Sequence, residues 1–141
     1  MATFSIFDIA GQAMSAQNIR LNTIASNMAN AETVGSSEAD TYRAKYPVFS
    51  TVKMQVEGEE QGSSIARGVR VDGLVESKTP VQMKYDPSHP KADQNGYVYL
   101  SNVNAVQEMA DMISASRSFQ TNVQMLNTAK ELMQHALNLG K

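Results

Sequence analysis

Residues 105–139, AVQEMADMISASRSFQTNVQMLNTAKELMQHALNL, decide the fold. The stretch contains no proline or glycine, and its apolar residues recur at seven-residue spacing, which is typical of a helix packed along one face. Asn104 is a suitable N-cap, Glu108 and Asp111 suit the positive end of the helix dipole, and Gly140 is a natural stop. The apolar positions are Ala105, Met112, Phe119, Leu126 and Met133, with Met109, Val123 and Leu137 at the companion position.

A second helical pattern covers residues 6–31, with Ser5 as its expected N-cap. Its stripe consists of Phe7, Met14, Leu21 and Met28, widened by Ala10, Ile24 and Ala31 and interrupted by Gln17. Only Asp8 and Arg20 are charged within this segment, and the other positions are mostly Asn, Ser, Gln, Thr and Ala. Surface helices usually carry charges on their wet face. A helix with small, uncharged side chains on every face is suited to neighbours on several sides.

Residues 32–104 have a different character. All four prolines and most of the glycines of the chain lie there. Short β-prone runs alternate with these breakers, at residues 48–56, 69–77, 81–85 and 97–101. We predict a loop between strands at 58–62 and a polar, flexible segment at 33–40. The β-prone runs predict a small, mostly antiparallel sheet.

These patterns predict an α+β fold. Two long terminal helices are expected to form an antiparallel coiled-coil-like hairpin that carries a small antiparallel β insert. Residues 1–31 and 105–141 are the predicted N- and C-terminal helices of an inner assembly domain, and 32–104 are a loop and β-rich insert. Because a lone two-helix hairpin buries only its facing seams, neighbouring subunits are expected to supply the remaining burial and to couple folding to assembly.

Composition excludes several kinds of site. The 141 residues carry a net charge of −2 without a block of like charge, so neither a nucleic-acid arm nor a basic membrane patch is predicted. The absence of cysteine excludes disulfides and thiolate metal sites. The first residues lack a basic region followed by a long apolar run, so no cleaved signal peptide is expected. No segment approaches the roughly 20 apolar residues that cross a bilayer.

Possible chemical sites are better explained structurally. Asp86, His89 and Asp93 could suggest a metal site, but two prolines among turn residues favour a structural loop. The serines at 114, 116 and 118 lie within a helix and not on a strained nucleophile turn. We therefore predict no catalytic, cofactor-binding or metal-binding residues. Arg117 is either an exposed side chain or a partner in an intersubunit hydrogen bond or ion pair that fixes the register.

The residues also resemble a known family. The stretch LNTIASNMANA, residues 21–31, resembles the N-terminal signature of bacterial flagellar axial proteins, which comprise rod, hook and hook-associated subunits. The segments YRAK (42–45), GVRV (68–71), YDPSHPKAD (85–93) and GYV (96–98) are similar to the insert of proximal rod members, as is much of 108–130. Residues 34–40 and 57–64 match least, so nothing is carried over to them.

The resemblance implies a rod subunit of the flagellar basal body. Such subunits are exported by the flagellar type III apparatus without a cleaved signal and polymerise in the periplasm through their terminal helices. Implied partners are other rod proteins, copies of the same chain, the export apparatus, and the MS ring or an adaptor at the rod base. Nucleic acid, direct membrane insertion and cofactors are not expected. The alternatives are another axial subunit, such as hook, or a helical adaptor that does not polymerise.

The predicted subunit interface combines the apolar stripes with polar residues that could fix the register. Its members are Phe7, Met14, Leu21, Ile24, Asn27, Met28, Asn30, Met109, Met112, Arg117, Phe119, Val123, Leu126, Met133 and Leu137.

Overall fold

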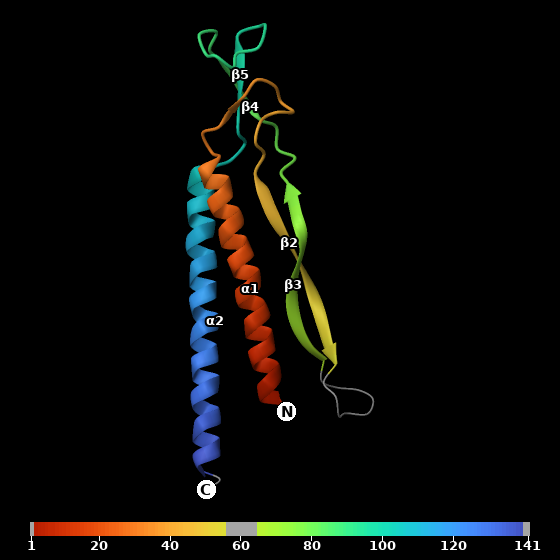
Figure 1. The fold of residues 1–141 in the computed structure, drawn as a ribbon, viewed down its shortest axis with the longest axis vertical. Helices are drawn as coiled ribbons and strands as arrows, with labels where there is room; N and C mark the ends of the chain where they lie inside the picture. Colours follow the sequence, from red (N-terminus) through yellow and green to blue (C-terminus); the bar gives the residue numbers. More distant parts are fainter. Residues whose placement is uncertain (1, 56–64, 140–141) are drawn as a thin grey trace. The chain divides into compact units, whose positions relative to one another are not determined.

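The computed structural model describes residues 2–55 and 65–139 (Figure 1). The elements follow the order α1 (Ala2–Ala29), β1 (Val34–Gly35), β2 (Lys45–Gln55), β3 (Ile65–Glu76), β4 (Gln82–Tyr85), β5 (Tyr97–Leu100) and α2 (Ala105–Leu139). The loop predicted at 58–62 and the helix stop predicted at Gly140 lie outside the described residues.

Both helices occupy the terminal segments, and the N-cap of α2 is confirmed. The Asn104 Oδ1 atom accepts hydrogen bonds from the backbone N–H groups of Val106 at 3.1 Å and Gln107 at 3.2 Å. At the other end of the chain, α1 begins at Ala2, ahead of the expected cap Ser5. Past the end of α1, the Asn30 side-chain amide donates to the Ser26 carbonyl at 2.8 Å, which satisfies one of the carbonyls in the last turn.

The strands form two separate antiparallel sheets. In the three-stranded sheet, β5 lies between β1 and β4, and Met83 of β4 faces Tyr99 of β5. The second sheet is the ribbon of β2 and β3 (Figure 1). Gly96 precedes β5 with a φ of 80°, a backbone conformation that glycine adopts without a Cβ clash.

The predicted antiparallel coiled-coil-like hairpin with a single β insert is wrong. Such a seam requires large apolar side chains buried at regular positions on both helices. The buried helix positions are instead Ala10, Ala16, Thr23, Ile24, Asn27, Glu108, Ala115 and Ala129, which are mostly small or polar. The predicted single sheet is interrupted at residues 77–81, because Pro80 has no N–H group to continue the ladder of hydrogen bonds. After this interruption β4 pairs with β5 and does not extend the sheet of β3.

The chain divides into two compact units, each with a small core. The first unit comprises Met1–Ile19, Val48–Gly73 and Ser114–Lys141, and its buried apolar residues, among those described, are all alanines. The second unit comprises Arg20–Pro47 and Leu74–Ile113 and buries Ile24, Ala44 and Val98. It also buries five polar or charged residues: Thr23, Asn27, Thr41, Ser101 and Glu108. Within the described ranges, neither helix has the length and apolar character needed to cross a membrane.

Candidate assembly surface

The predicted interface residues differ widely in burial. Ile24 and Asn27 are buried within the chain, whereas Met109, Arg117 and Leu137 are exposed. The others are half-buried: Phe7, Met14, Leu21, Met28, Asn30, Met112, Phe119, Val123, Leu126 and Met133. Most of the predicted surface is therefore partly accessible, and its role between subunits stays a prediction.

Helix α2 carries a set of highly exposed apolar side chains that we call the α2 apolar set. Its members have exposed fractions between 52% and 77% and are Val106, Met109, Ile113, Met125, Leu132 and Leu137. The buried residues of α2 are instead Glu108, Ala115 and Ala129. Four members, Val106, Ile113, Met125 and Leu132, were missed from the sequence. A sequence signal for these four residues exists. Val106 and Ile113, like Met125 and Leu132, are seven residues apart, which is the spacing of the predicted stripe.

A polar junction in the second unit joins α1, β2 and α2. Asn27 of α1 is 0% exposed, and its Nδ2 donates to the Lys45 carbonyl at 2.9 Å. Its Oδ1 accepts from the Lys45 backbone N–H at 2.9 Å and from the Tyr42 hydroxyl at 3.0 Å. Glu108 of α2 is 1% exposed and also accepts a hydrogen bond from the Asn27 side chain. Asn27 thus meets its hydrogen-bonding needs inside the chain.

The two acidic side chains at this junction differ in their surroundings, because Asp111 is paired with a cation and Glu108 is buried. Arg20 of α1 forms an ion pair with Asp111 of α2 at 2.9 Å. Burial raises the pKa of Glu108, and the nearby Asp111 carboxylate raises it further, while hydrogen bonds from Asn27 and Tyr46 act in the opposite direction. Burial also raises the pKa of Tyr46, as do Glu108 and Asp111. The junction therefore disfavours negative charge on Glu108 and on Tyr46.

The sequence had indicated a different role for the acidic residues. Glu108 and Asp111 were predicted as partners of the helix dipole, yet Glu108 is enclosed and Asp111 is paired with Arg20. Arg117 is exposed, and its side chain forms no ion pair within residues 2–55 and 65–139. Its proposed intersubunit role stays a prediction.

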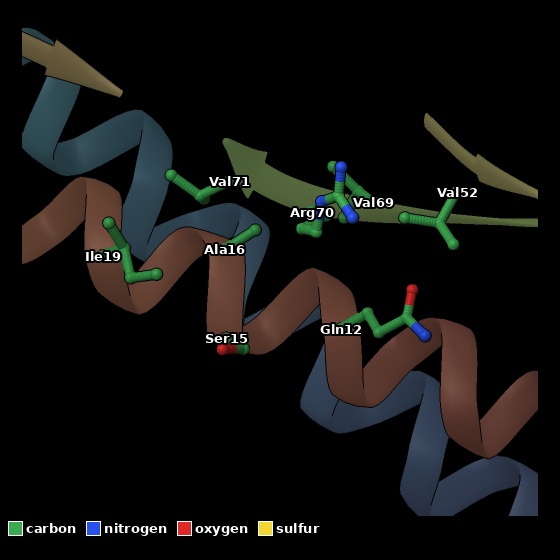
Figure 2. A pocket seen from close by; sticks show the side chains of 8 residues that line it. All are labelled: Gln12, Ser15, Ala16, Ile19, Val52, Val69, Arg70 and Val71. Atoms are coloured by element: carbon green, nitrogen blue, oxygen red, sulfur yellow. The ribbon is translucent and has the colours of Figure 1, made fainter. Parts of the chain in front are cut away.

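A groove of about 410 Å³ lies in the first unit between α1 and the β2–β3 ribbon (Figure 2). Its walls combine apolar groups with a few polar ones: Gln12, Ser15, Ala16, Ile19, Val52, Val69, Arg70 and Val71. In Figure 2 the Gln12 side chain extends from α1 toward the strands, and Ala16 also faces β3. The strand backbone approaches closely here, because a Cβ added at Gly68 would collide with the Gln12 carboxamide. This groove suits apolar side chains better than a charged ligand.

The residues once considered for metal binding form a hydrogen-bonded loop. The backbone N–H of Lys91 donates to the His89 Nδ1 atom at 3.1 Å. Asp93 Oδ1 accepts from the backbone N–H groups of Asn95 and Tyr97, both at 2.8 Å. Across the part of the chain that the structure describes, no three His, Asp or Glu side chains are grouped so that they could hold a metal ion.

Comparisons with known proteins match the chain along its length. Residues 7–35 match the family described as flagella basal body rod protein, and residues 94–139 match the flagellar basal body rod FlgEFG protein C-terminal family. The flagellar basal-body rod protein FlgC of Salmonella typhimurium is 45% identical over 141 residues, covering all of both chains. The protein of the same name from Yersinia enterocolitica is 46% identical, and the match covers 100% of both chains. The one from Borreliella burgdorferi is 35% identical, and the match covers 97% of both chains.

Proposed function

This chain belongs to the FlgC family of flagellar basal-body rod proteins, and we propose that it polymerises through its terminal helices into the proximal part of a hollow rod. Its role is that of a structural rod subunit. We further propose that the rod built from such subunits spans the periplasm and that the subunit catalyses no reaction. Its neighbours there would be copies of itself and other rod proteins.

The α2 apolar set carries this proposal. Six large apolar side chains stand more than half exposed on one helix, whereas the described part of the first unit buries only alanines among its apolar residues. Contact with water is costly for such side chains, by about 1.5–3 kcal/mol each between full exposure and full burial. Large apolar side chains that stay exposed in such number on one helix are candidates for contact with a partner. Neighbouring subunits would supply the missing burial.

Further partners follow from the sequence resemblance alone. We propose export by the flagellar type III apparatus without a cleaved signal peptide. Contact with the MS ring, or with an adaptor at the rod base, is proposed on the same ground. Finding the protein only in the cytoplasm of flagellated cells would favour the alternative of a non-polymerising adaptor.

The proposal is tested by making the α2 apolar set polar near its C-terminal end. Leu132 and Leu137 are 64% and 69% exposed, so Leu132→Ser with Leu137→Ser should leave the subunit fold intact. If subunits bury these side chains, incorporation into purified basal bodies should fall about tenfold or more, since losing about 1.4 kcal/mol is a tenfold change in an equilibrium. Incorporation is measured by quantitative immunoblot in a flagellated host that lacks its own copy of the gene.

A matched control uses the same helix. Gln134→Ser shortens an exposed polar side chain of α2 and should enter basal bodies at the unchanged level. The amount of each variant exported into the medium separates failed assembly from failed export. Full incorporation of the double variant, together with normal swimming, would rule out this part of α2 as an assembly surface.

A further inference from the structure

Glu108 is the most enclosed ionisable group of the described chain. It is 1% exposed and lies in the second unit at the junction where α1, β2 and α2 meet. Asn27 of α1 and Tyr46 of β2 both donate hydrogen bonds to its carboxyl group. A single side chain of α2 thus contacts polar groups from the two other elements. Any change in its charge acts on all three elements together.

The cations that α1 and β2 contribute to the second unit are paired with other acids. Arg20 of α1 pairs with Asp111 at 2.9 Å, and Lys45 of β2 lies 3.7 Å from Glu76 of β3. Asp111, one turn further along α2, adds a second negative charge near Glu108 and repels its ionised form. The hydroxyl groups of Tyr46, on β2, and Tyr42, on the segment before it, also face the junction. Glu108 has no counter-ion among the described residues.

One carboxyl oxygen of Glu108 is buried without a hydrogen-bond partner among the residues that the structure describes. The Oε2 atom is shielded from water and has no hydrogen-bond partner within the described ranges. An ionised carboxylate enclosed without a counter-ion is strongly disfavoured, and such groups normally hold a proton instead. A neutral carboxylic acid still accepts the hydrogen bonds from Asn27 and Tyr46 through its other oxygen. The geometry therefore favours the neutral acid over the carboxylate.

We propose that Glu108 takes up a proton when the second unit folds, so that the stability of the junction of α1, β2 and α2 depends on this proton. The junction is most stable while Glu108 is neutral and is weakened when Glu108 ionises. This property belongs to the chain itself and does not require that the chain assemble into a rod.

The direction of the pH dependence follows from the raised pKa of Glu108. Its ordinary value is 4.5, and burial raises it in the folded chain. The folded state then holds more protons than the unfolded state, so the stabilisation is fully present below about pH 4.5 and is lost as the pH rises through the folded-state pKa. Alkaline conditions should loosen the junction, and acid conditions should tighten it.

The test compares the full chain with Glu108→Gln, which keeps the shape of the side chain but cannot ionise. Urea unfolding is followed by circular dichroism from about pH 3 to about pH 8, because the full effect appears only well below the ordinary pKa of 4.5. For each half unit by which the Glu108 pKa is raised, the unfolding equilibrium constant of the unchanged chain should rise about threefold more than that of the variant. Glu131→Gln, which removes an exposed carboxylate of α2, should keep the pH dependence of the unchanged chain.

A second measurement covers the case in which the Gln variant fails to fold. Infrared difference spectra of the unchanged chain over the same pH range should show a protonated carboxyl band that disappears as Glu108 ionises, together with changes in the tyrosine bands from Tyr46. Equal pH dependence of unfolding in the unchanged chain and Glu108→Gln would overturn the proposal. So would infrared spectra in which all carboxyl groups ionise together at about pH 4.5 and no protonated carboxyl band disappears at a higher pH.

Discussion

At the scale of single residues, Asn27 takes the place of a neighbouring strand for β2. Its amide bonds both the N–H and the C=O group of Lys45, the first residue of the strand. In a sheet these two backbone groups would pair with another strand. A side chain can do this only when it is buried and held, and Asn27 is 0% exposed and further bonded to Tyr42 and Glu108. The first residue of β2 is thereby fixed to α1.

Replacing Asn27 with Ala should therefore destabilise the second unit. The change leaves the partly buried Lys45 backbone groups and the Tyr42 hydroxyl without their partner. Each such group costs about 1–3 kcal/mol when fully buried, and less here because water can reach part of them. We expect a total loss of about 2–4 kcal/mol in the free energy of unfolding, measured by urea titration. Asn127→Ala, at an exposed position of α2, should change this value by less than about 0.5 kcal/mol. A similar small effect at Asn27 would show that the junction contributes little.

The sequence placed Asn27 at the predicted subunit interface and Glu108 in the first turn of a helix. The structure buries both side chains at one junction, and the role of Asn27 between subunits stays a prediction. An acidic residue in the first turn of a helix is normally explained by the dipole, and nothing local distinguishes a buried one. The distinguishing signal is longer in range. Glu108, Ala115 and Ala129 are separated by multiples of seven residues and form the buried line of α2. Recognising that line requires knowing that small residues, and not the methionines, face inward.

At the scale of elements, the approach of β3 to α1 depends on one missing side chain. Gly68 of β3 is buried, and the Gln12 carboxamide occupies the space that a Cβ would fill. Both residues belong to the first unit, and Gln12 lines the groove of Figure 2 together with Val69, the residue that follows Gly68. Any larger residue at position 68 must displace Gln12 or move the strand. Because the colliding carboxamide is the far end of the flexible Gln12 side chain, rotating this side chain costs less than moving the strand.

Gly68→Ala should consequently destabilise the first unit by about 1–2 kcal/mol, at the low end of what overpacking usually costs. In a Gln12→Ala background the same change should cost much less, because the colliding group is gone. Urea unfolding of the four chains forms a double-mutant cycle. Gly73→Ala is the matched control on the same strand, where an added Cβ meets nothing within 4 Å. Additive effects of the Gly68 and Gln12 substitutions would contradict this explanation.

The elements themselves could largely be predicted from the sequence, whereas their pairing could not. β-prone runs and breakers placed β2 to β5 within a few residues of their observed bounds, since both signals are local. The two-residue strand β1 was missed within a segment predicted to be flexible. It exists because Val34 and Gly35 pair with Leu100 and Tyr99, residues more than 60 positions away. Long-range pairing of this kind leaves no periodic signal in so short a segment.

At the scale of the whole molecule, the two units hold themselves together by different means. The second unit combines buried Ile24 and Val98 with a polar junction and a three-stranded sheet. The described part of the first unit buries only alanines among its apolar residues, which contribute little apolar area per residue. Its share of α2, from Ser114 onward, also carries three of the exposed apolar residues. Internal burial should therefore stabilise the described part of the first unit less than it stabilises the second unit.

This difference predicts uneven hydrogen exchange in the free, full-length chain. Amides of α2 between residues 125 and 138 should exchange many times faster than those of β4 and β5, because only Ala129 is buried in that part of the helix. After assembly into basal bodies, the same helical amides should slow markedly as neighbours cover Met125, Leu132 and Leu137, while those of β5 change little. Mass spectrometry of peptides from the free and assembled states gives both rates. Strong protection of residues 125–138 in the free chain would mean that α2 is stable alone, and assembly would then have to be explained without coupled ordering.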